Sequence, residues 1–263
     1  MASESLTTQA RIFILVVAFL GWFFGGIQIG ITNLAMHPAA EDLIKKAEWA
    51  GSLSEQGMTD TVRSWYAYFQ CAFLFGAAVG GFLFGRLGDR IGRTRALGIS
   101  IIWFSIFTGA SYVAQNPTQL LLLRFITCLG VGGCWPNGVA LVSEAWSKVA
   151  RPVMASLIGM AGNLGIFAIA TLGKQFEVTP ESWRWVLLIG ATPTLLGLAI
   201  LLWVKESPSW TSSQKEKSST PSEHLKDVSV FGRPYVGITI IGIALATVPL
   251  FGGWGSANWI IPW

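Results

Sequence analysis

The sequence predicts an all-α membrane protein with a six-helix transmembrane bundle and a seventh helix that begins an incomplete second half. Three observations support this fold class. Hydrophobic residues make up 52% of the chain and charged residues only 12%, whereas a soluble domain carries roughly 25% charged residues. The mean hydropathy is +0.54. Long apolar segments alternate with short charged ones along most of the chain.

Six segments are each long and apolar enough to cross a bilayer, which takes about 20 residues at the helical rise. We expect the corresponding helices at residues 12–36, 64–84, 96–114, 119–146, 152–172 and 185–204. Residues 37–63 carry mixed charge and are predicted to form a long external loop. Residues 174–184 form a second predicted external segment.

Composition divides the chain into three parts. Residues 1–210 contain the predicted six-helix bundle. Residues 211–233 are rich in Ser, Lys, Glu, Thr and Pro and are predicted to be a flexible cytoplasmic linker. Residues 234–263 are uncharged and predict a seventh transmembrane helix, the start of a truncated second half.

The distribution of charge predicts the orientation. The formal net charge is +4, and most basic residues lie in segments that would share one side of the membrane with the N-terminus. Lys and Arg near helix ends are retained on the cytoplasmic side. We therefore expect a multi-pass protein of the cell membrane with a cytoplasmic N-terminus, in contact with the lipid bilayer. Because membrane topology accounts for the basic excess, no nucleic-acid partner is predicted.

The segment from Gly85 to Arg95 carries most of the sequence-specific information. It contains four arginines, one aspartate and three glycines, and it lies between two long apolar stretches. Such a connection predicts a tight hairpin at the water surface. Glycine suits a tight turn or a close backbone approach, and Asp89 can accept charge-assisted hydrogen bonds from arginines. An ordinary basic hairpin would explain the arginines but not the aspartate or the glycines.

This segment resembles the signature loop between the second and third helices of the major facilitator superfamily. The matching residues are Gly85, Leu87, Asp89, Arg90, Gly92 and Arg93. Thr94 departs from the basic residue of the family pattern, although Arg95 follows it. The resemblance covers most of residues 11–210. In appearance the chain is nearest to metabolite, organic-acid and sugar-porter-like members.

The resemblance implies a six-plus-six architecture in which each half is a pair of inverted three-helix repeats. It also implies transport by alternating access, with the two halves rocking about a site near the midplane. One half supplies one wall of such a site. A second six-helix half is therefore the partner expected for activity, together with a small-molecule solute and a coupling ion.

Arg124 is the sharpest single candidate for solute binding. It lies inside a predicted helix, where an arginine costs at least about 2.5 kcal/mol at mid-bilayer. The run from Arg124 to Gly133 resembles the family motif of an arginine followed by spaced glycines, with Cys128 in place of a glycine. The resemblance associates this arginine with substrate binding or proton coupling. The alternative is an arginine that extends to the outer surface.

Several uncharged polar residues within the predicted helices are further candidates for the solute site. Asn137 follows Pro136, which removes a backbone hydrogen bond and can free a carbonyl toward a cavity. An interhelical hydrogen bond at a kink is an equally good interpretation of Asn137. In the resembled fold, helices 1, 2, 4 and 5 line the cleft. This favours Gln28, Asn33, Gln70 and Asn163.

A second set of residues is predicted to form a conformational latch. Glu206 lies in a segment that looks like the sequence after helix 6 in sugar-porter-like and organic-ion relatives. The resemblance implies ion pairs between such acids and the arginines of the signature loop in the outward-open state. Solvated surface charges are the alternative. The predicted latch residues are Gly85, Asp89, Arg90, Gly92, Arg93, Glu144, Arg151 and Glu206.

Together these features predict a secondary active transporter, a symporter or a facilitator, of a small organic solute. A carboxylate is favoured because Arg124 can pair with one, and a sugar is the alternative within this class. The rival class is a non-transporting protein, either a half-length remnant or a membrane sensor or partner subunit. No mid-membrane carboxylate is present in the six helices, so this half predicts no proton-coupling acid.

Enzymatic chemistry is not expected. The chain has only two histidines and three cysteines, and no spacing of a nucleophile and a base occurs. Cys71, Cys128 and Cys134 fall in apolar segments and predict small packing residues. No catalytic residue, metal site or cofactor is predicted.

Overall fold

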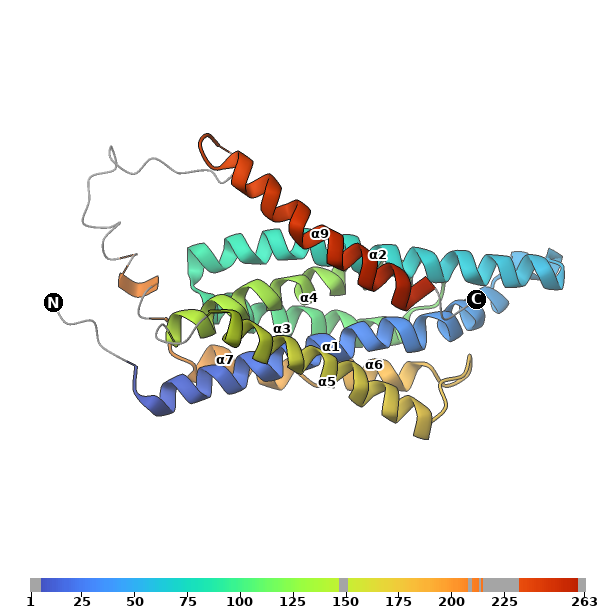
Figure 1. Ribbon diagram of the computed structural model, residues 1–263. Coiled ribbons are helices and arrows are strands. Elements are labelled where there is room, and N and C mark those ends of the chain that lie inside the picture. Colours follow the sequence, from blue (N-terminus) through green and yellow to red (C-terminus); the bar gives the residue numbers. More distant parts are fainter. Residues whose placement is uncertain (1–5, 147–150, 208–209, 213, 215–231, 260–263) are drawn as a thin grey trace. The chain divides into compact units, whose positions relative to one another are not determined.

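A computed structural model describes residues 6–146, 151–207, 210–212, 214 and 232–259. The chain divides into two compact units, Met1–Ser212 and Ser213–Trp263. In the first unit the described segments are helical and contain no strand (Figure 1). Their order is α1 Thr8–Lys45, η1 Glu48–Ser52, α2 Glu55–Ile91, α3 Arg93–Ala110, η2 Ser111–Val113, α4 Pro117–Ala145, α5 Arg151–Gln175, α6 Arg184–Ala191 and α7 Thr194–Trp203.

Six helices among the described residues are long and apolar enough to cross a membrane. Five are α1 to α5, and the sixth consists of α6 and α7 together, residues 184–203. The predicted all-α membrane fold is therefore confirmed. The sixth span is broken because Pro193 has no N–H to donate. Thr192 and Pro193 form a turn between α6 and α7.

The packing of the first unit relates its two helix triplets. α1 packs along α5, and α2 packs along α4. The first triplet is α1, α2 and α3, and the second is α4, α5 and the α6–α7 span. If α1 is exchanged with α4, α2 with α5 and α3 with the α6–α7 span, the α1–α5 pair becomes the α4–α2 pair, and the contact of α3 with α6 and α7 is unchanged. This is the pattern expected of two three-helix repeats. The central helices are α1 and α4, which also contact each other.

Glycines bring the paired helices into backbone contact. A Cβ atom at Gly80 of α2 would collide with the carbonyl oxygen of Leu129 in α4. A Cβ atom at Gly26 of α1 would collide in the same way with the carbonyl oxygen of Gly162 in α5. Small residues permit such close approach of membrane helices, which are held together by van der Waals packing.

The prediction of a long external loop at residues 37–63 is wrong. α1 continues through Pro38 to Lys45, and α2 begins at Glu55, so only a short connection containing η1 remains. Figure 1 shows the joined ends of these two helices as a projection of the bundle. At about 1.5 Å per residue, each helix is longer than the roughly 30 Å hydrocarbon core.

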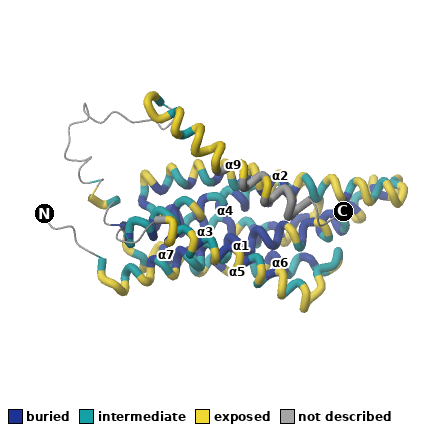
Figure 2. The backbone as a smooth tube through the Cα atoms, in the orientation of Figure 1, coloured by how far each residue is buried: buried dark blue, intermediate teal, exposed yellow. Residues whose placement is uncertain are grey.

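Burial explains why helix persists in this charged region. The added turns of α1 carry an apolar face, in which Ala39, Leu43 and Ile44 are buried against Val62 and Trp183. Figure 2 shows this alternation of buried and exposed residues along the tube. The charged residues between them interrupt the apolar run without ending the amphipathic pattern.

In the second unit the described residues include α9, Val236–Trp259. This helix lies within the segment predicted to begin a second half. The predicted linker at 211–233 lies mostly outside the described residues.

Candidate functional site

Arg124 lies at the centre of the bundle and is fully buried. Its Nη2 donates to Thr32 Oγ1 at 2.7 Å and to the Gln28 backbone oxygen at 3.4 Å. Its Nη1 donates to Gln28 Oε1 at 3.4 Å. All three acceptors belong to α1, so this arginine ties α4 to α1. It neither extends to a surface nor faces an open space, which differs from both sequence-based interpretations.

Gln28 extends the same network to two more helices. Its Nε2 donates to the Gly190 carbonyl of α6 at 2.9 Å, and its Oε1 accepts from Thr108 Oγ1 of α3 at 3.0 Å. No carboxylate among the described residues forms an ion pair with Arg124. Arg124 Nε and Thr127 Oγ1 are buried without a partner. The buried guanidinium of Arg124 is therefore surrounded by uncharged acceptors, and its Nε–H has no hydrogen-bond acceptor in the described part of the chain.

Asn137 lies in the interface between α4 and α2. It is fully buried, and its Nδ2 donates to the carbonyls of Phe84 and Gly133, each at 2.9 Å. Its Oδ1 lies so close to Gly88 of α2 that a Cβ atom at that position would collide with it. This geometry favours the interhelical hydrogen bond over contact with a solute, because one donor hydrogen binds the Phe84 carbonyl of α2 and the other binds the Gly133 carbonyl of α4 itself.

Asn33 and Gln70 are brought together on another face. Gln70 Nε2 donates to Asn33 Oδ1 at 2.9 Å and to the Tyr66 hydroxyl at 2.8 Å. The His37 ring lies 5.9 Å from the Tyr66 ring, measured between centroids. Asn33 and His37 are exposed. We refer to Asn33, His37, Tyr66 and Gln70 as the α1–α2 polar cluster.

The sequence analysis placed His37 outside the membrane helices, but it lies within α1, one turn after Asn33. Its position followed from the unexpected length of α1. Asn163 is exposed on α5, and its Nδ2 makes only a 3.4 Å contact with the Gly159 carbonyl of its own helix. It therefore remains separate from the α1–α2 polar cluster.

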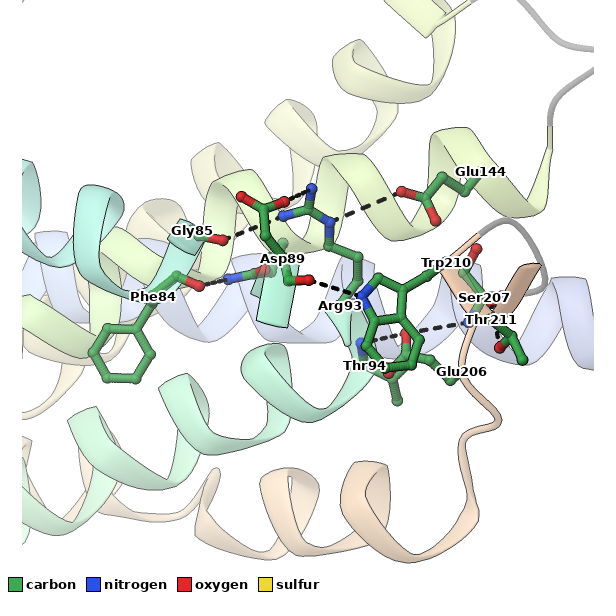
Figure 3. Close-up of polar contacts among 11 residues, drawn as sticks. Phe84, Gly85, Asp89, Arg93, Thr94, Glu144, Glu206, Ser207, Trp210 and Thr211 are labelled. Atoms are coloured by element: carbon green, nitrogen blue, oxygen red, sulfur yellow. Dashed lines mark hydrogen bonds and ion pairs between the residues drawn. The ribbon is translucent and has the colours of Figure 1, made fainter. Parts of the chain in front are cut away.

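At the junction of α2 and α3, Arg93 joins three segments (Figure 3). Its Nη2 lies 2.5 Å from Asp89 Oδ1, and its Nη1 donates to the Gly85 carbonyl at 3.4 Å. Its Nε lies 3.8 Å from Glu144 Oε1 near the end of α4. The side chains of Arg93, Asp89 and Glu144 thus lie together at this junction, and their role as a latch stays a prediction.

Glu206 makes contacts that differ from the predicted ion pairs. Its Oε1 accepts from the backbone N–H groups of Thr94 at 3.0 Å and Ser207 at 3.1 Å. No described arginine forms an ion pair with it. The carboxylate caps the first turn of α3, where free N–H groups and the helix dipole favour an anion. Figure 3 shows this contact beside Trp210.

The signature segment is almost entirely helical, so the predicted hairpin loop is wrong. α2 runs through Ile91 and α3 begins at Arg93, so Gly92 alone separates them. Gly92 has φ +108°, and a Cβ there would collide with the Glu206 carboxylate. Glycine is required at this position for both reasons.

The remaining predicted latch residues contribute less to this junction. Arg90 is exposed and forms no ion pair with a described residue. Arg151 begins α5, but its side chain lies outside the described residues. The sequence analysis missed Trp210, whose Nε1 donates to the Asp89 carbonyl at 3.1 Å. We refer to Gly92, Arg93, Glu144, Glu206 and Trp210, with Asp89, as the α2–α3 clasp.

Comparison with known families identifies the chain. The family model described as Major Facilitator Superfamily matches residues 12–262. The chain belongs to the major facilitator superfamily. The six membrane helices and the α2–α3 clasp are therefore parts of a multi-pass membrane protein of this superfamily.

Two curated relatives and one solved structure describe this similarity. The chain is 29% identical to the "Putative niacin/nicotinamide transporter NiaP" of Bacillus subtilis, over 99% of the chain and 60% of the relative. It is 34% identical to the "4-hydroxybenzoate transporter PcaK" of Pseudomonas putida, over 50% of the chain and 30% of the relative. The chain therefore spans at most about three fifths of the length of these relatives.

The solved structure is the inward-open xylose transporter XylE from Escherichia coli. It matches with a TM-score of 0.65 and 23% identity, over 89% of the chain and 60% of the other protein. At this identity the match shows the shared superfamily fold.

At the end of the bundle opposite the α2–α3 clasp, this superfamily member carries a charged contact that the sequence analysis missed. Asp42 Oδ2 accepts from Arg184 Nη1 at 2.9 Å and from Trp183 Nε1 at 3.0 Å. Lys46 Nζ lies 2.7 Å from Asp42 Oδ1. Arg184 also donates to the carbonyls of Tyr112 and Ala114, each at 3.1 Å. We refer to Asp42, Trp183 and Arg184, with Lys46, as the Asp42 clamp.

Proposed function

We propose that this chain forms the first half of a secondary carrier that moves a small organic carboxylate by alternating access. The match to the superfamily over residues 12–262 carries this proposal. The bundle has the architecture that such a half requires, with α1 and α4 central and related helix pairs on either side. A second six-helix half is proposed as the partner that completes the site.

The names of the relatives support an aromatic carboxylate as the solute. Niacin and 4-hydroxybenzoate, which name the Bacillus and Pseudomonas relatives, are both flat aromatic acids. The α1–α2 polar cluster offers amide, hydroxyl and imidazole groups on an exposed face. Such groups can hydrogen-bond a carboxylate. A sugar is the second candidate, supported by the fold shared with the xylose transporter.

Arg124 is proposed to act on the solute site indirectly. Its guanidinium is fully buried and held by Gln28 and Thr32 of α1. It fixes the position of α1 relative to α4, and both helices carry exposed residues on the proposed solute face. The amide of Gln28 does not titrate, so this contact by itself supplies no proton coupling.

The α2–α3 clasp is proposed to lie on the cytoplasmic side and to favour the outward-open state. Exposed ion pairs contribute about 0–1 kcal/mol each. Several small terms together can bias two states that differ by a few kcal/mol. The Arg93 contacts join α2 to α4, and the Glu206 cap joins α3 to the segment after α7.

Uptake by proteoliposomes tests the carrier function. The chain would be reconstituted by itself and within any longer reading frame that contains it, and supplied with labelled nicotinate, 4-hydroxybenzoate or xylose. We expect saturable uptake of the two acids by the longer form. Faster uptake with an inward proton gradient would identify a symporter, and no dependence would identify a facilitator. Absence of uptake of all three solutes in both forms would favour the non-transporting alternative, a sensor or partner subunit.

A further inference from the structure

Two tryptophans on the central helices form an aromatic pair that the solute-site analysis has not used. The rings of Trp22 in α1 and Trp135 in α4 lie 5.1 Å apart between centroids, with their planes inclined by 54°. Trp135 is 37% exposed, and Trp22 is partly exposed. The inclined arrangement leaves ring surface uncovered on the exposed side.

The pair differs from four other tryptophans of the bundle, which are held by hydrogen bonds of the indole N–H. Trp103, Trp146, Trp183 and Trp210 each donate the indole N–H to an oxygen of another segment. Within the described residues, no such bond holds Trp22 or Trp135. Buried tryptophans ordinarily satisfy this donor. The two rings are therefore not fixed as polar anchors between helices.

Small residues of α5 provide the space around the pair. A Cβ at Gly162 would lie 2.5 Å from Trp22 Nε1, and a Cβ at Gly159 would lie 3.7 Å from the Trp135 ring. Asn163 follows Gly162 and is exposed. Three helices thus meet at the pair, with a side-chain amide adjacent in sequence to the glycine that touches Trp22.

The position of the pair agrees with the proposed solute face. Trp22 and Asn33 are eleven residues apart in α1, which is about three helical turns and a rise of about 16 Å. They therefore lie on the same stripe of the helix. Elsewhere α1 packs on α5, α6 and α7, and α4 packs on α2 and α3. Along α1, the stripe that carries Trp22 therefore continues to Asn33 of the α1–α2 polar cluster.

We propose that Trp22 and Trp135 form a ring-binding subsite for the planar ring of an aromatic carboxylate. This inference rests on the proposed function and names the residues that select its solute class. An aromatic ring can pack against indole faces in tilted or offset geometry, which contributes about 0.5–1.5 kcal/mol beyond simple burial. A saturated ring of similar size is stabilised by burial of its apolar surface but lacks this additional aromatic contribution. Asn163 lies where a polar substituent of the solute can be bound.

Binding measurements with matched ligands test the subsite. The purified chain, within any longer reading frame that contains it, would be titrated with labelled nicotinate and with cyclohexanecarboxylate, which has a saturated ring. We expect Trp135→Leu and Trp22→Leu each to weaken nicotinate binding by roughly 3- to 10-fold. Cyclohexanecarboxylate binding should change by less than about 2-fold. The Phe variants should retain nicotinate binding within about 3-fold, because the π surface remains.

Trp203→Leu is the matched control, because Trp203 of α7 is 70% exposed and lies outside the pair. It should bind both ligands as the unsubstituted protein does. Unchanged nicotinate binding in both Leu variants would overturn the subsite, as would equal loss of both ligands or no nicotinate binding by the unsubstituted protein. Nicotinate binding that depends on the pair, without uptake in liposomes, would leave the subsite standing and overturn the carrier proposal. Nicotinate uptake that neither Leu variant changes would overturn the subsite and leave the carrier proposal standing.

Discussion

The two ends of the bundle are both held by charged side chains, but in different environments. In the α2–α3 clasp, the Asp89 side chain is 64% exposed, and Arg93 reaches Glu144 only at 3.8 Å. In the Asp42 clamp, the Asp42 side chain is 10% exposed and accepts hydrogen bonds from Arg184 and Trp183 at 2.9 and 3.0 Å. The Arg184 guanidinium also lies 4.3 Å from the centroid of the Trp183 ring.

This difference predicts that the two ends differ in how readily they can be disrupted. Exposed ion pairs are weak and are screened by salt, so the clasp can open at small cost. A buried carboxylate with several donors is costly to disrupt, because removing one partner leaves a charge poorly compensated. The Asp42 clamp links α1, α6 and the segment that follows α3, whereas the clasp links α2, α3, α4 and the segment that follows α7.

The largest expected effect is that of Arg184→Ala. The substitution removes the bonds to Asp42, Tyr112 and Ala114, and the contact with the Trp183 ring. We expect a loss of about 3 kcal/mol in the free energy of unfolding, measured by denaturant titration of the detergent-solubilised protein. Lys45→Ala is the control, because its pair with Glu41 is exposed. Equal effects of the two substitutions would contradict the distinction between a buried clamp and surface pairs.

Gly92→Ala should have the next largest effect. Alanine at φ +108° is strained, and its Cβ would collide with the Glu206 carboxylate. We expect a loss of about 2 kcal/mol in the same titration. Gly85→Ala is the matched control in the same segment, because no atom lies within 4 Å of a Cβ there. A large loss for Gly85→Ala, with none for Gly92→Ala, would show that the turn is assigned to the wrong residue.

Glu206→Gln separates the charge of the cap from its hydrogen bonds. The amide oxygen can still accept from Thr94 and Ser207, but the negative charge at the α3 N-terminus is lost. We expect a loss of roughly 0.5–1 kcal/mol for Gln and about 1–2 kcal/mol for Ala. If Glu206 instead acts through ion pairs with arginines, Gln and Ala should be equally damaging, and the loss should disappear at high salt.

Arg93→Ala should have the smallest effect on stability, below about 1 kcal/mol, because its partners are partly solvated. Its effect should appear in conformation. Distances between spin labels placed near the ends of α2 and α4 should broaden in Arg93→Ala and, to a smaller degree, in the unsubstituted protein at high salt. A sharp distribution that matches the unsubstituted protein would mean that Arg93 does not hold the clasp closed.

The signature segment shows how far the sequence analysis could go. Its residue pattern predicted the superfamily's signature segment between two membrane helices. Arg93, Asp89 and Glu144 were expected to lie close together. Its conformation was not predicted, because glycine and charge at high density are typical of a loop. The helix continues to Ile91 because Gly92 alone provides the turn, and Glu206 caps α3 from 112 residues away along the chain.

The candidate solute residues show the same division. Gln28, Asn33, Gln70, Asn137 and Asn163 were chosen because polar side chains are scarce in the predicted helices. Their partners depend on helix rotation, which weak amphipathic periodicity in membrane helices does not reveal. Packing placed Gln28 beside Arg124, Asn33 beside Gln70, and Asn137 between α4 and α2.

The sequence by itself determined the membrane class, the six helices and the family, because these depend on apolar length and on residues at fixed local spacing. Tertiary structure decided which polar groups meet, where helices end in charged regions, and which tryptophans remain open. Those features depend on contacts between segments distant in sequence, as when Asp42 meets Arg184 or Trp22 meets Trp135. Such contacts are set by side-chain packing, and local composition does not encode them.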